Sequence, residues 1–176
     1  MDKKTLRKEI IEKRKNLSFE RKILAKERII NKLKEDEHFL KADFVGLFSP
    51  VGGEVDLTEI MIMFPEKIYA LPKVVNDRIM YLQVDAHSKL KKSSFGILEP
   101  QFGFDITHKL EVILVPSLGM TKDFYRLGFG KGYFDKFFRN RQSIYKIGII
   151  YEDEVVEFEP TEYDIPLNDY FAGWEA

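Results

Sequence analysis

Three glycines alternate with larger residues in the segment 126–135, which reads Arg-Leu-Gly-Phe-Gly-Lys-Gly-Tyr-Phe-Asp. Alternating glycines let backbone N–H groups approach a bound anion, because no side chain stands between them and the ligand. Arg126 and Lys131 add positive charge on either side of the glycines, and Asp135 adds a carboxylate. The glycine spacing alone is more typical of a tight structural turn. Together with the three charged residues, it favours a loop that binds a phosphate group.

The spacing separates this loop from two common phosphate-binding motifs. The Walker A loop requires Gly-x-x-x-x-Gly-Lys-Ser/Thr and the dinucleotide fingerprint requires Gly-x-Gly-x-x-Gly, and neither is complete here. An apolar run at 112–116 predicts a buried strand before the loop, and a helix is expected from Gly132 to about Arg139. Because α/β proteins bind ligands at the carboxyl ends of parallel strands, we expect the loop at that edge of a sheet.

Further strands and helices alternate along the rest of the chain. Apolar runs predict strands at 43–49, 67–71, 79–84, 112–115, 144–150 and 170–172. Helices are expected at 2–15 with Leu6, Ile10 and Ile11 inward, at 18–37 with Ser18 as N-cap and Ile23, Leu24, Ile30 and Leu33 inward, and from a capping box at 56–59 to Met63. This order predicts an α/β fold, a Rossmann-like layered domain with a mostly parallel sheet and helices on both faces. We expect one domain over residues 1–176, in which 1–41 form a basic helical arm packed on the α/β body.

Composition excludes several classes of protein. The 176 residues contain no cysteine, which excludes a disulfide scaffold, a thiolate zinc site and a cysteine nucleophile. Residues 1–17 are charged throughout and lack the apolar core of a signal peptide, and no apolar run approaches the roughly 18 residues of a membrane span. The three histidines are scattered without metal-ligand spacing. We expect a cytoplasmic protein that does not bind membranes.

The charges are distributed unevenly along the chain. Residues 1–34 hold 13 basic and 5 acidic side chains, whereas the remaining residues hold 15 basic and 24 acidic ones. A basic helical arm can be a solvated surface, a site for a polyanionic small molecule such as a nucleotide, or a nucleic-acid interface. Glutamates at 9, 12, 20 and 27 interrupt the basic residues at helical spacing. That pattern suits intrahelical ion pairs and disfavours nucleic acid.

Several motifs in a fixed order resemble the 5-formyltetrahydrofolate cyclo-ligase family, also called methenyltetrahydrofolate synthetases. The motif Arg-Leu-Gly-Phe-Gly-Lys-Gly-Tyr-Phe-Asp after a strand that ends Val-Pro is similar to the signature of that family. Similar motifs are Lys-Lys-Thr-Leu-Arg at 3–7, Lys-Arg-Lys-Asn-Leu-Ser at 13–18, Gly-Glu-Val-Asp-Leu at 53–57, Leu-Pro-Lys-Val at 71–74, Phe-Gly-Ile-Leu-Glu-Pro at 95–100 and Tyr-Asp-Ile-Pro-Leu-Asn at 163–168. The resemblance covers most of the chain and implies a fold of the sugar-isomerase and CoA-transferase class.

The resemblance implies an enzyme that converts 5-formyltetrahydrofolate to 5,10-methenyltetrahydrofolate with ATP and Mg²⁺, releasing ADP and phosphate. In this family the formyl oxygen is phosphorylated, N10 attacks the activated carbon, and phosphate leaves as the ring closes. Such chemistry depends on positioning and on neutralisation of charge. The implied partners are ATP and a reduced folate, with or without a polyglutamate chain, and not nucleic acid. The protein is expected to be a monomer.

The resemblance also implies the residues of the site. Arg126 and Lys131 are the implied catalytic residues, and Asp135 and Asp164 supply hard oxygen ligands for Mg²⁺. The implied ATP-binding residues are Lys3, Lys4, Arg7, Arg126, Gly128, Phe129, Gly130, Lys131, Gly132, Tyr133 and Phe134. The implied folate-binding residues are Ser49, Glu54, Phe95, Lys131 and Tyr133, with the carboxylate facing pterin nitrogens and the aromatic rings facing the flat pterin.

The chain departs from the family pattern at two places. The family has Ala/Gly-Phe-Asp-x-x-Gly before the arginine, whereas this chain has Gly-Met-Thr at 119–121 and then Phe124, so a carboxylate and a glycine are missing. The usual glutamine of a late strand corresponds to Glu154. Two alternatives to the enzyme therefore stay open: a related protein that binds nucleotide or folate without turnover, and a nucleic-acid-binding module that uses the basic arm.

Overall fold

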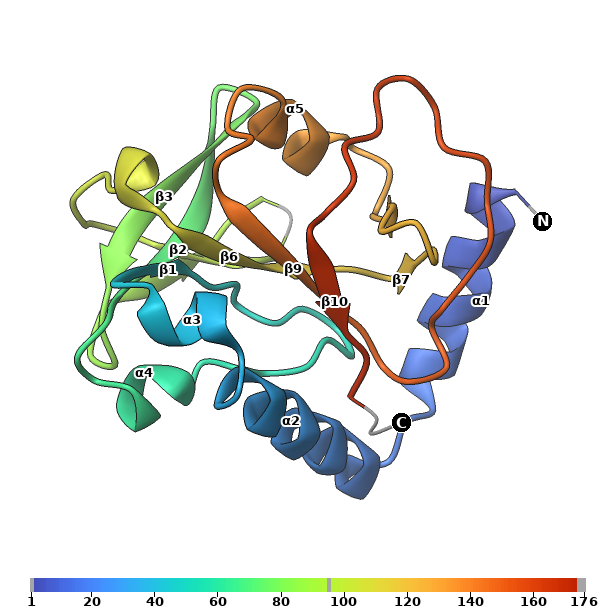
Figure 1. Cartoon of the computed structure of the whole chain (residues 1–176), viewed down its shortest axis with the longest axis horizontal. Coiled ribbons are helices and arrows are strands. Elements are labelled where there is room, and N and C mark those ends of the chain that lie inside the picture. Colours follow the sequence, from blue (N-terminus) through green and yellow to red (C-terminus); the bar gives the residue numbers. More distant parts are fainter. Residues whose placement is uncertain (1, 95, 174–176) are drawn as a thin grey trace.

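The computed structural model describes residues 2–94 and 96–173 and has a six-stranded sheet at its centre (Figure 1). The strands are β1 (Phe44–Gly46), β2 (Ile68–Val75), β3 (Arg78–Val84), β6 (Val112–Pro116), β9 (Tyr145–Ile149) and β10 (Asp169–Phe171). Their order in the sheet is β10-β9-β6-β1-β2-β3, and every neighbouring pair is parallel except β2 and β3. The expected α/β fold with a mostly parallel sheet is confirmed.

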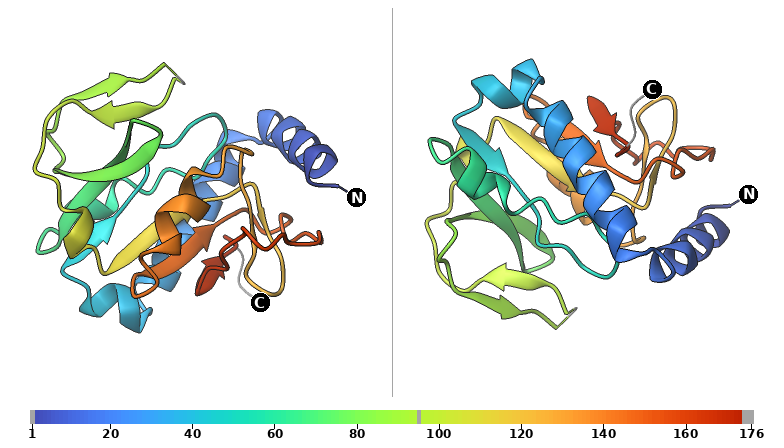
Figure 2. Two further views of the ribbon diagram at one scale, coloured as in Figure 1. Left: turned by 90° about the horizontal axis from the view of Figure 1, so that it is seen from above. Right: turned by 90° about the horizontal axis from the view of Figure 1, so that it is seen from below.

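Helices cover both faces of this sheet, as Figures 1 and 2 show. On one face lie α2 (Phe19–Leu33), α3 (Glu37–Lys41) and α4 (Ile60–Met63), and on the other lie α5 (Tyr133–Arg139) and a 3-10 turn at Thr107–Lys109. Alternate residues of β6 divide between the two faces: Leu114 packs in the first core and Ile113 in the second. Both are fully buried, which is why this strand reads as an unbroken apolar run.

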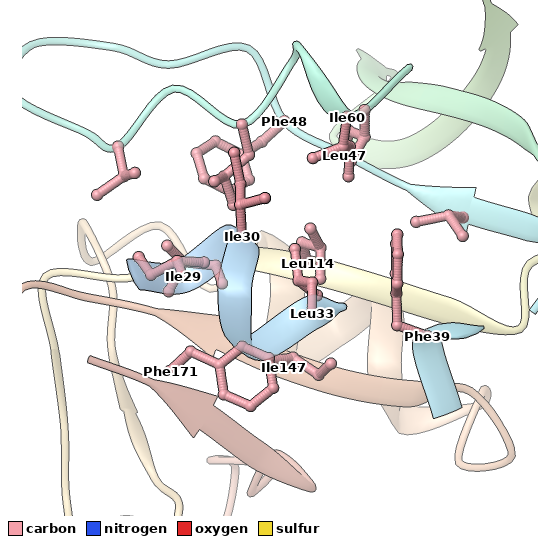
Figure 3. Packing of buried hydrophobic residues seen from close by; sticks show 14 of the residues in the cluster. Ile29, Ile30, Leu33, Phe39, Leu47, Phe48, Ile60, Leu114, Ile147 and Phe171 are labelled. Atoms are coloured by element: carbon pink, nitrogen blue, oxygen red, sulfur yellow. The ribbon is translucent and has the colours of Figure 1, made fainter. Parts of the chain in front are cut away.

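Figure 3 shows the larger core, where α2 lies across the sheet. Ile29 and Leu33 are completely buried against Leu114 and Ile147. Ser18 caps this helix as expected, because its hydroxyl accepts a hydrogen bond from the backbone N–H of Arg21 at 3.1 Å.

Helix α1 (Lys3–Lys15) stands apart from the sheet, beside β7 (Gly119–Met120) (Figure 1). Leu6 and Ile10 form a separate small cluster with Leu118 and Leu127. Strand β7 pairs with β8 (Arg126–Leu127), and a second small ribbon joins β4 (Leu90–Lys92) to β5 (Leu98–Pro100). Within residues 2–94 and 96–173, no helix is long and apolar enough to cross a membrane.

The first two helices differ from expectation in their inward faces. Ile11 and Leu24 are 37% and 42% exposed, and Ile23 is only half-buried, whereas Arg14 is 5% and Ala25 1% exposed. Apolar residues outnumber the positions that each narrow contact stripe provides, so the tertiary contact decides which of them are buried.

Two helix boundaries also differ from expectation. Helix α2 ends at Leu33, and the side chain of Asp36 caps a new helix, α3, by accepting from the backbone N–H of Phe39 at 2.9 Å. The expected capping box at 56–59 does not form, because the Asp56 carboxylate accepts from both the N–H and the hydroxyl of Thr58. Helix α4 therefore begins only at Ile60.

Candidate active site at the glycine loop

The glycine loop connects β8 to α5 and has the backbone conformation that its glycines allow. Gly130 has a φ of 95° and Gly132 a φ of 70°, a region that side-chain-bearing residues rarely adopt. Gly132 is also the residue before α5, where the structure shows no side-chain cap. Gly130 and Gly132 are thus required by the path of the chain, and they keep the backbone open toward the site.

Helix α1 lies against this loop, although the two are far apart in the sequence. The Arg7 Nε donates to the carbonyl oxygen of Gly128 at 2.7 Å. The guanidinium of Arg7 also lies 3.4 Å from the point that a side chain on Gly130 would occupy. The basic arm and the glycine loop, both expected to contact ATP, therefore form one continuous surface.

Arg126 lies beneath the loop as a partly buried cation. Its Nε donates to the carbonyl of Pro116 at 2.9 Å, and its guanidinium lies 4.7 Å from the centre of the Phe134 ring. Burial lowers the pKa of Arg126 to about 10, although the nearby carboxylates of Asp135 and Glu54 oppose this effect. Arg126 therefore remains positively charged at neutral pH and interacts electrostatically with two of the expected acidic site residues.

The two expected metal ligands lie on adjoining segments. One oxygen of Asp135 accepts from the backbone N–H of Ile165 at 3.0 Å, next to Asp164 in the chain. The Asp164 carboxylate accepts from Lys3 Nζ and from the backbone N–H of Thr161, both at 2.8 Å. Although burial alone would raise it, the pKa of Asp164 is held below its ordinary value by these hydrogen bonds and the charge of Lys3.

The donor set fits a Mg²⁺ ion that is shared with a nucleotide. Mg²⁺ in phosphoryl-transfer sites is commonly held by one or two carboxylates together with substrate phosphates and water. Asp135 and Asp164 supply such oxygens, and the described part of the chain holds no group of three histidine, cysteine or acidic side chains that could hold a metal ion. The residues are therefore suited to an ion that arrives with phosphates, and less suited to a metal that protein ligands alone enclose.

The expected folate residues lie in two regions beside the loop. Ser49 is buried in the segment after β1, and burial raises the pKa of Glu54, whose carboxylate accepts from the backbone N–H of Val51 at 2.8 Å. Tyr133 lines a cavity of about 390 Å³. The other residues that line this cavity are Val74, Asn76, Asp77, Ser93, Ser94 and Glu99. Phe95 lies outside the described residues.

The remaining residues that are expected to bind ATP are exposed or half-buried. Lys4 is exposed on α1, and Phe129 and Lys131 are exposed on the glycine loop. Phe134 is half-buried in α5, where its ring packs on that of Phe138 at 5.7 Å. A second cavity, of about 250 Å³, opens between α1, the 51–53 segment and Phe129.

Sequence reasoning missed a buried ion pair at the edge of this second cavity. Arg14 and Glu154 are 5% and 3% exposed, and two hydrogen bonds of 2.7 and 2.8 Å join them. Arg14 could have been noticed because it continues the buried stripe of Leu6 and Ile10 at steps of four residues. The family pattern places this position in a late strand, whereas Glu154 lies in the turn that follows β9.

Comparisons with known proteins show the family to which this chain belongs. Residues 1–171 match the model of the 5-formyltetrahydrofolate cyclo-ligase family. The chain belongs to this family. A 5-formyltetrahydrofolate cyclo-ligase from Mycoplasma pneumoniae is 31% identical over 96% of both chains, and one from Mus musculus is 25% identical over 95% of this chain and 91% of the mouse protein.

Two solved structures of methenyltetrahydrofolate synthetases resemble this cyclo-ligase family member in fold. The Aquifex aeolicus protein is 36% identical, with a TM-score of 0.85, over 99% of this chain and 91% of that one. The Mycoplasma pneumoniae protein is 26% identical, with a TM-score of 0.81, over 99% of this chain and 100% of that one. The family is one of 5-formyltetrahydrofolate cyclo-ligase enzymes.

Proposed function

We propose that this chain converts 5-formyltetrahydrofolate to 5,10-methenyltetrahydrofolate at the expense of ATP, with ADP and phosphate as the other products. Membership of the cyclo-ligase family supports the reaction. The observation that carries the proposal is the 2.7 Å hydrogen bond from Arg7 to Gly128, because it unites the two segments that we assign to ATP. We further propose that the protein acts as a monomer in the cytoplasm.

In the proposed reaction the formyl oxygen attacks the γ-phosphorus and ADP leaves. The N10 amine then attacks the activated formyl carbon and loses its proton, and the phosphate departs with the electron pair of the C–O bond. Arg126 and Lys131 neutralise the charge that spreads over the phosphoryl oxygens during transfer. Glu54 accepts hydrogen bonds from pterin N–H groups, while Tyr133, Phe95 and Ser49 complete the folate site.

The nucleotide is assigned to α1 and the glycine loop. Lys3, Lys4 and Arg7 supply positive charge from the helix, whereas the loop supplies backbone donors at Gly128, Gly130 and Gly132. Phe129, Tyr133 and Phe134 supply aromatic surface beside them. Asp135 and Asp164 would hold Mg²⁺, which when bound supplies positive charge that offsets the charge of the phosphates.

The chain departs from the family pattern at Thr121 and Phe124. These two residues do not favour the alternative of a related protein that binds nucleotide or folate without turnover. The Thr121 hydroxyl accepts from the backbone N–H of Tyr125 at 3.1 Å, so a neutral side chain closes this turn. Phe124 takes a φ of 70° without being glycine, and its carbonyl accepts from the backbone N–H of Leu167 at 2.8 Å. The segment thus keeps a glycine-like conformation and its contact with the segment after Asp164.

Contacts of the basic arm also disfavour the nucleic-acid alternative. Lys3, Arg7 and Arg14 are directed at Asp164, Gly128 and Glu154 of the body. A nucleic-acid surface requires cations directed outward to contact phosphates. These three cations instead face the body of the protein, where Lys3 and Arg7 lie beside the segments assigned to Mg²⁺ and ATP.

The deciding experiment mixes purified protein with 5-formyltetrahydrofolate, ATP and Mg²⁺ and follows absorbance of the methenyl product. We expect product only when both substrates are present. Folded protein, verified by circular dichroism, that gives no ATP-dependent signal would overturn the proposed turnover. Calorimetric titration with each substrate would then distinguish a binding protein from a protein that binds neither.

A further inference from the structure

The Arg14–Glu154 ion pair lies where three loops of the body meet α1. Arg14 donates through Nε and Nη2 to the two carboxylate oxygens of Glu154, and Nη2 also donates to the carbonyl of Ser117 at 2.6 Å. Glu154 Oε1 additionally accepts from the backbone N–H of Tyr151 at 2.9 Å. Ser117 follows β6, and both Tyr151 and Glu154 follow β9.

The loop that follows β1 closes the third side of this pair. The Tyr151 hydroxyl donates to the carbonyl of Gly53 at 2.7 Å, and the Arg14 guanidinium lies 5.5 Å from the centre of the Tyr151 ring. A Cβ on Gly53 would lie 2.9 Å from the Arg14 Cβ, so helix and loop are in direct contact. Loops from three neighbouring parallel strands therefore meet around one helical side chain.

Stability alone does not account for this arrangement. Replacing a buried ion pair with apolar residues is often neutral or stabilising, because two charges must be removed from water to form the pair. A bidentate arginine–carboxylate contact, however, fixes distance and orientation, whereas apolar contacts are not directional. The apolar contacts of Leu6 and Ile10 alone would permit α1 to rotate or slide on the body.

The position of α1 matters because the helix carries Arg7 to the glycine loop. Arg7 and Arg14 are seven residues apart, which is about two helical turns and roughly 10 Å along the axis. A small rotation at Arg14 would therefore move the Arg7 guanidinium away from Gly128 and Gly130. The cavity of about 250 Å³ beside Arg14 would change shape as well, because Arg14 of the helix and Phe129 of the loop both line it.

We propose that Arg14 and Glu154 are positioning residues for the nucleotide: their buried pair sets α1 so that Arg7 meets the glycine loop and bound ATP. This inference rests on the proposed assignment of Arg7 and the loop to ATP. Neither residue of the pair is expected to touch the reacting atoms. The pair acts through Arg7.

The first test is Glu154→Met, which keeps a side chain of similar size but removes the charge and both acceptors. We expect the KM for ATP and its calorimetric Kd to rise about 10-fold, because a displaced contact residue weakens binding. The KM for 5-formyltetrahydrofolate should change less than about two-fold. Glu152→Met is the matched control, since it removes the ion pair between Arg21 of α2 and the same turn. This control should leave ATP binding unchanged.

Coupling to Arg7 distinguishes positioning from general damage. In an Arg7→Ala background, Glu154→Met should cause no further loss of ATP affinity, because the residue through which it acts is gone. Additive losses in the double variant would overturn the proposal. So would a normal ATP Kd in Glu154→Met accompanied only by a lower melting temperature.

A second variant guards against simple unfolding. The double variant Arg14→Met, Glu154→Met replaces the pair with apolar contacts, so it should fold as stably as the wild type while its ATP Kd stays raised. Wild-type ATP affinity in this variant would contradict a directional role. If the wild-type protein binds ATP but forms no methenyl product, the proposed reaction fails while the Kd measurements still decide the positioning role. If it binds no ATP, both proposals fail.

Discussion

Lys131 lies between Gly130 and Gly132, whose left-handed backbone holds the loop open beside it. A cation at this position can stabilise the phosphoryl group most strongly when charge moves during transfer. We expect bound ATP to gain less from it, because Arg7 also supplies positive charge beside the loop. At the scale of the single residue, Lys131 is therefore expected to affect turnover more than binding.

The expected outcome for Lys131→Ala is a kcat about 100-fold lower, with the KM for ATP changed only a few-fold. Steady-state kinetics of methenyl formation at saturating and limiting Mg²⁺ would measure both. Lys136→Ala is the matched control, because Lys136 is an exposed lysine on the following helix and should be dispensable. Near-normal turnover in Lys131→Ala would mean that the loop is only a structural turn.

The buried carboxyl group of Glu54 predicts that kcat/KM for the folate depends on pH. Burial raises its pKa above the ordinary 4.5, although Val51, Arg14 and Arg126 oppose this. The ionised carboxylate is therefore lost on acidification sooner than an exposed glutamate would be. We expect kcat/KM for the folate to fall as the pH drops through an apparent pKa above 4.5, measured in folded protein.

The variant Glu54→Gln should have a low kcat/KM for the folate that no longer shows this acid limb. An acid whose pKa is raised in the folded state lowers the stability of the protein once it ionises. The stability of the variant relative to the wild type should therefore be greater at neutral pH than at acidic pH. An unchanged acid limb in Glu54→Gln would assign the titration to another group.

At the scale of the element, α1 depends on close contact with the loop after β1. Gly53→Ala would place a Cβ 2.9 Å from the Arg14 Cβ and 3.2 Å from the Arg14 carbonyl oxygen. The helix must move outward to make room. We expect a raised KM for ATP and a loss of about 1–3 kcal/mol in the free energy of unfolding, from chemical denaturation.

Gly52→Ala is the control for this prediction. Gly52 has a φ of 58°, but a Cβ there would meet nothing within 4 Å. The substitution should therefore cost about 1–2 kcal/mol through backbone strain, without moving α1 or changing ATP affinity. Equal effects of the two substitutions on ATP affinity would show that contact with Arg14 is unimportant.

At the scale of the whole molecule, the two N-terminal helices are held to very different extents. Ile29 and Leu33 of α2 are 0% exposed in the main core, whereas α1 contributes only Leu6 and Ile10 to a small separate cluster. Segments with few buried apolar contacts open at lower free energy than core segments do. Helix α1 should therefore be the more dynamic element, and ligand binding should stabilise it.

Hydrogen exchange measured by mass spectrometry would test this difference. We expect amides of α1 to exchange faster than those of α2, and excess ATP to slow exchange in α1 and in the glycine loop. The exchange of α2 should change little and serves as the internal control. Exchange in α1 that is as slow as in α2 and insensitive to ATP would contradict the prediction.

Local patterns in the sequence were sufficient for the six strands of the central sheet and for α1, α2 and α5, but not for α3 or the two small ribbons. The apolar run at 112–116, the cap at Ser18 and the glycines at 130 and 132 each depend on neighbours a few residues away, and the structure has β6, α2 and the left-handed loop there. The family motifs likewise indicated the cyclo-ligase family that the comparisons show. Which residues bind ATP, folate and Mg²⁺ remains a prediction.

Only the tertiary structure decided which charged residues meet. The contacts Lys3–Asp164 and Arg14–Glu154 join segments at opposite ends of the chain, and the buried side of α1 includes an arginine in place of Ile11. Sequence periodicity shows that a helix has an apolar stripe, but the partner surface determines where that stripe ends. A charged side chain is buried only where a specific partner and hydrogen bonds compensate for its desolvation, and that partner is defined by the folded chain.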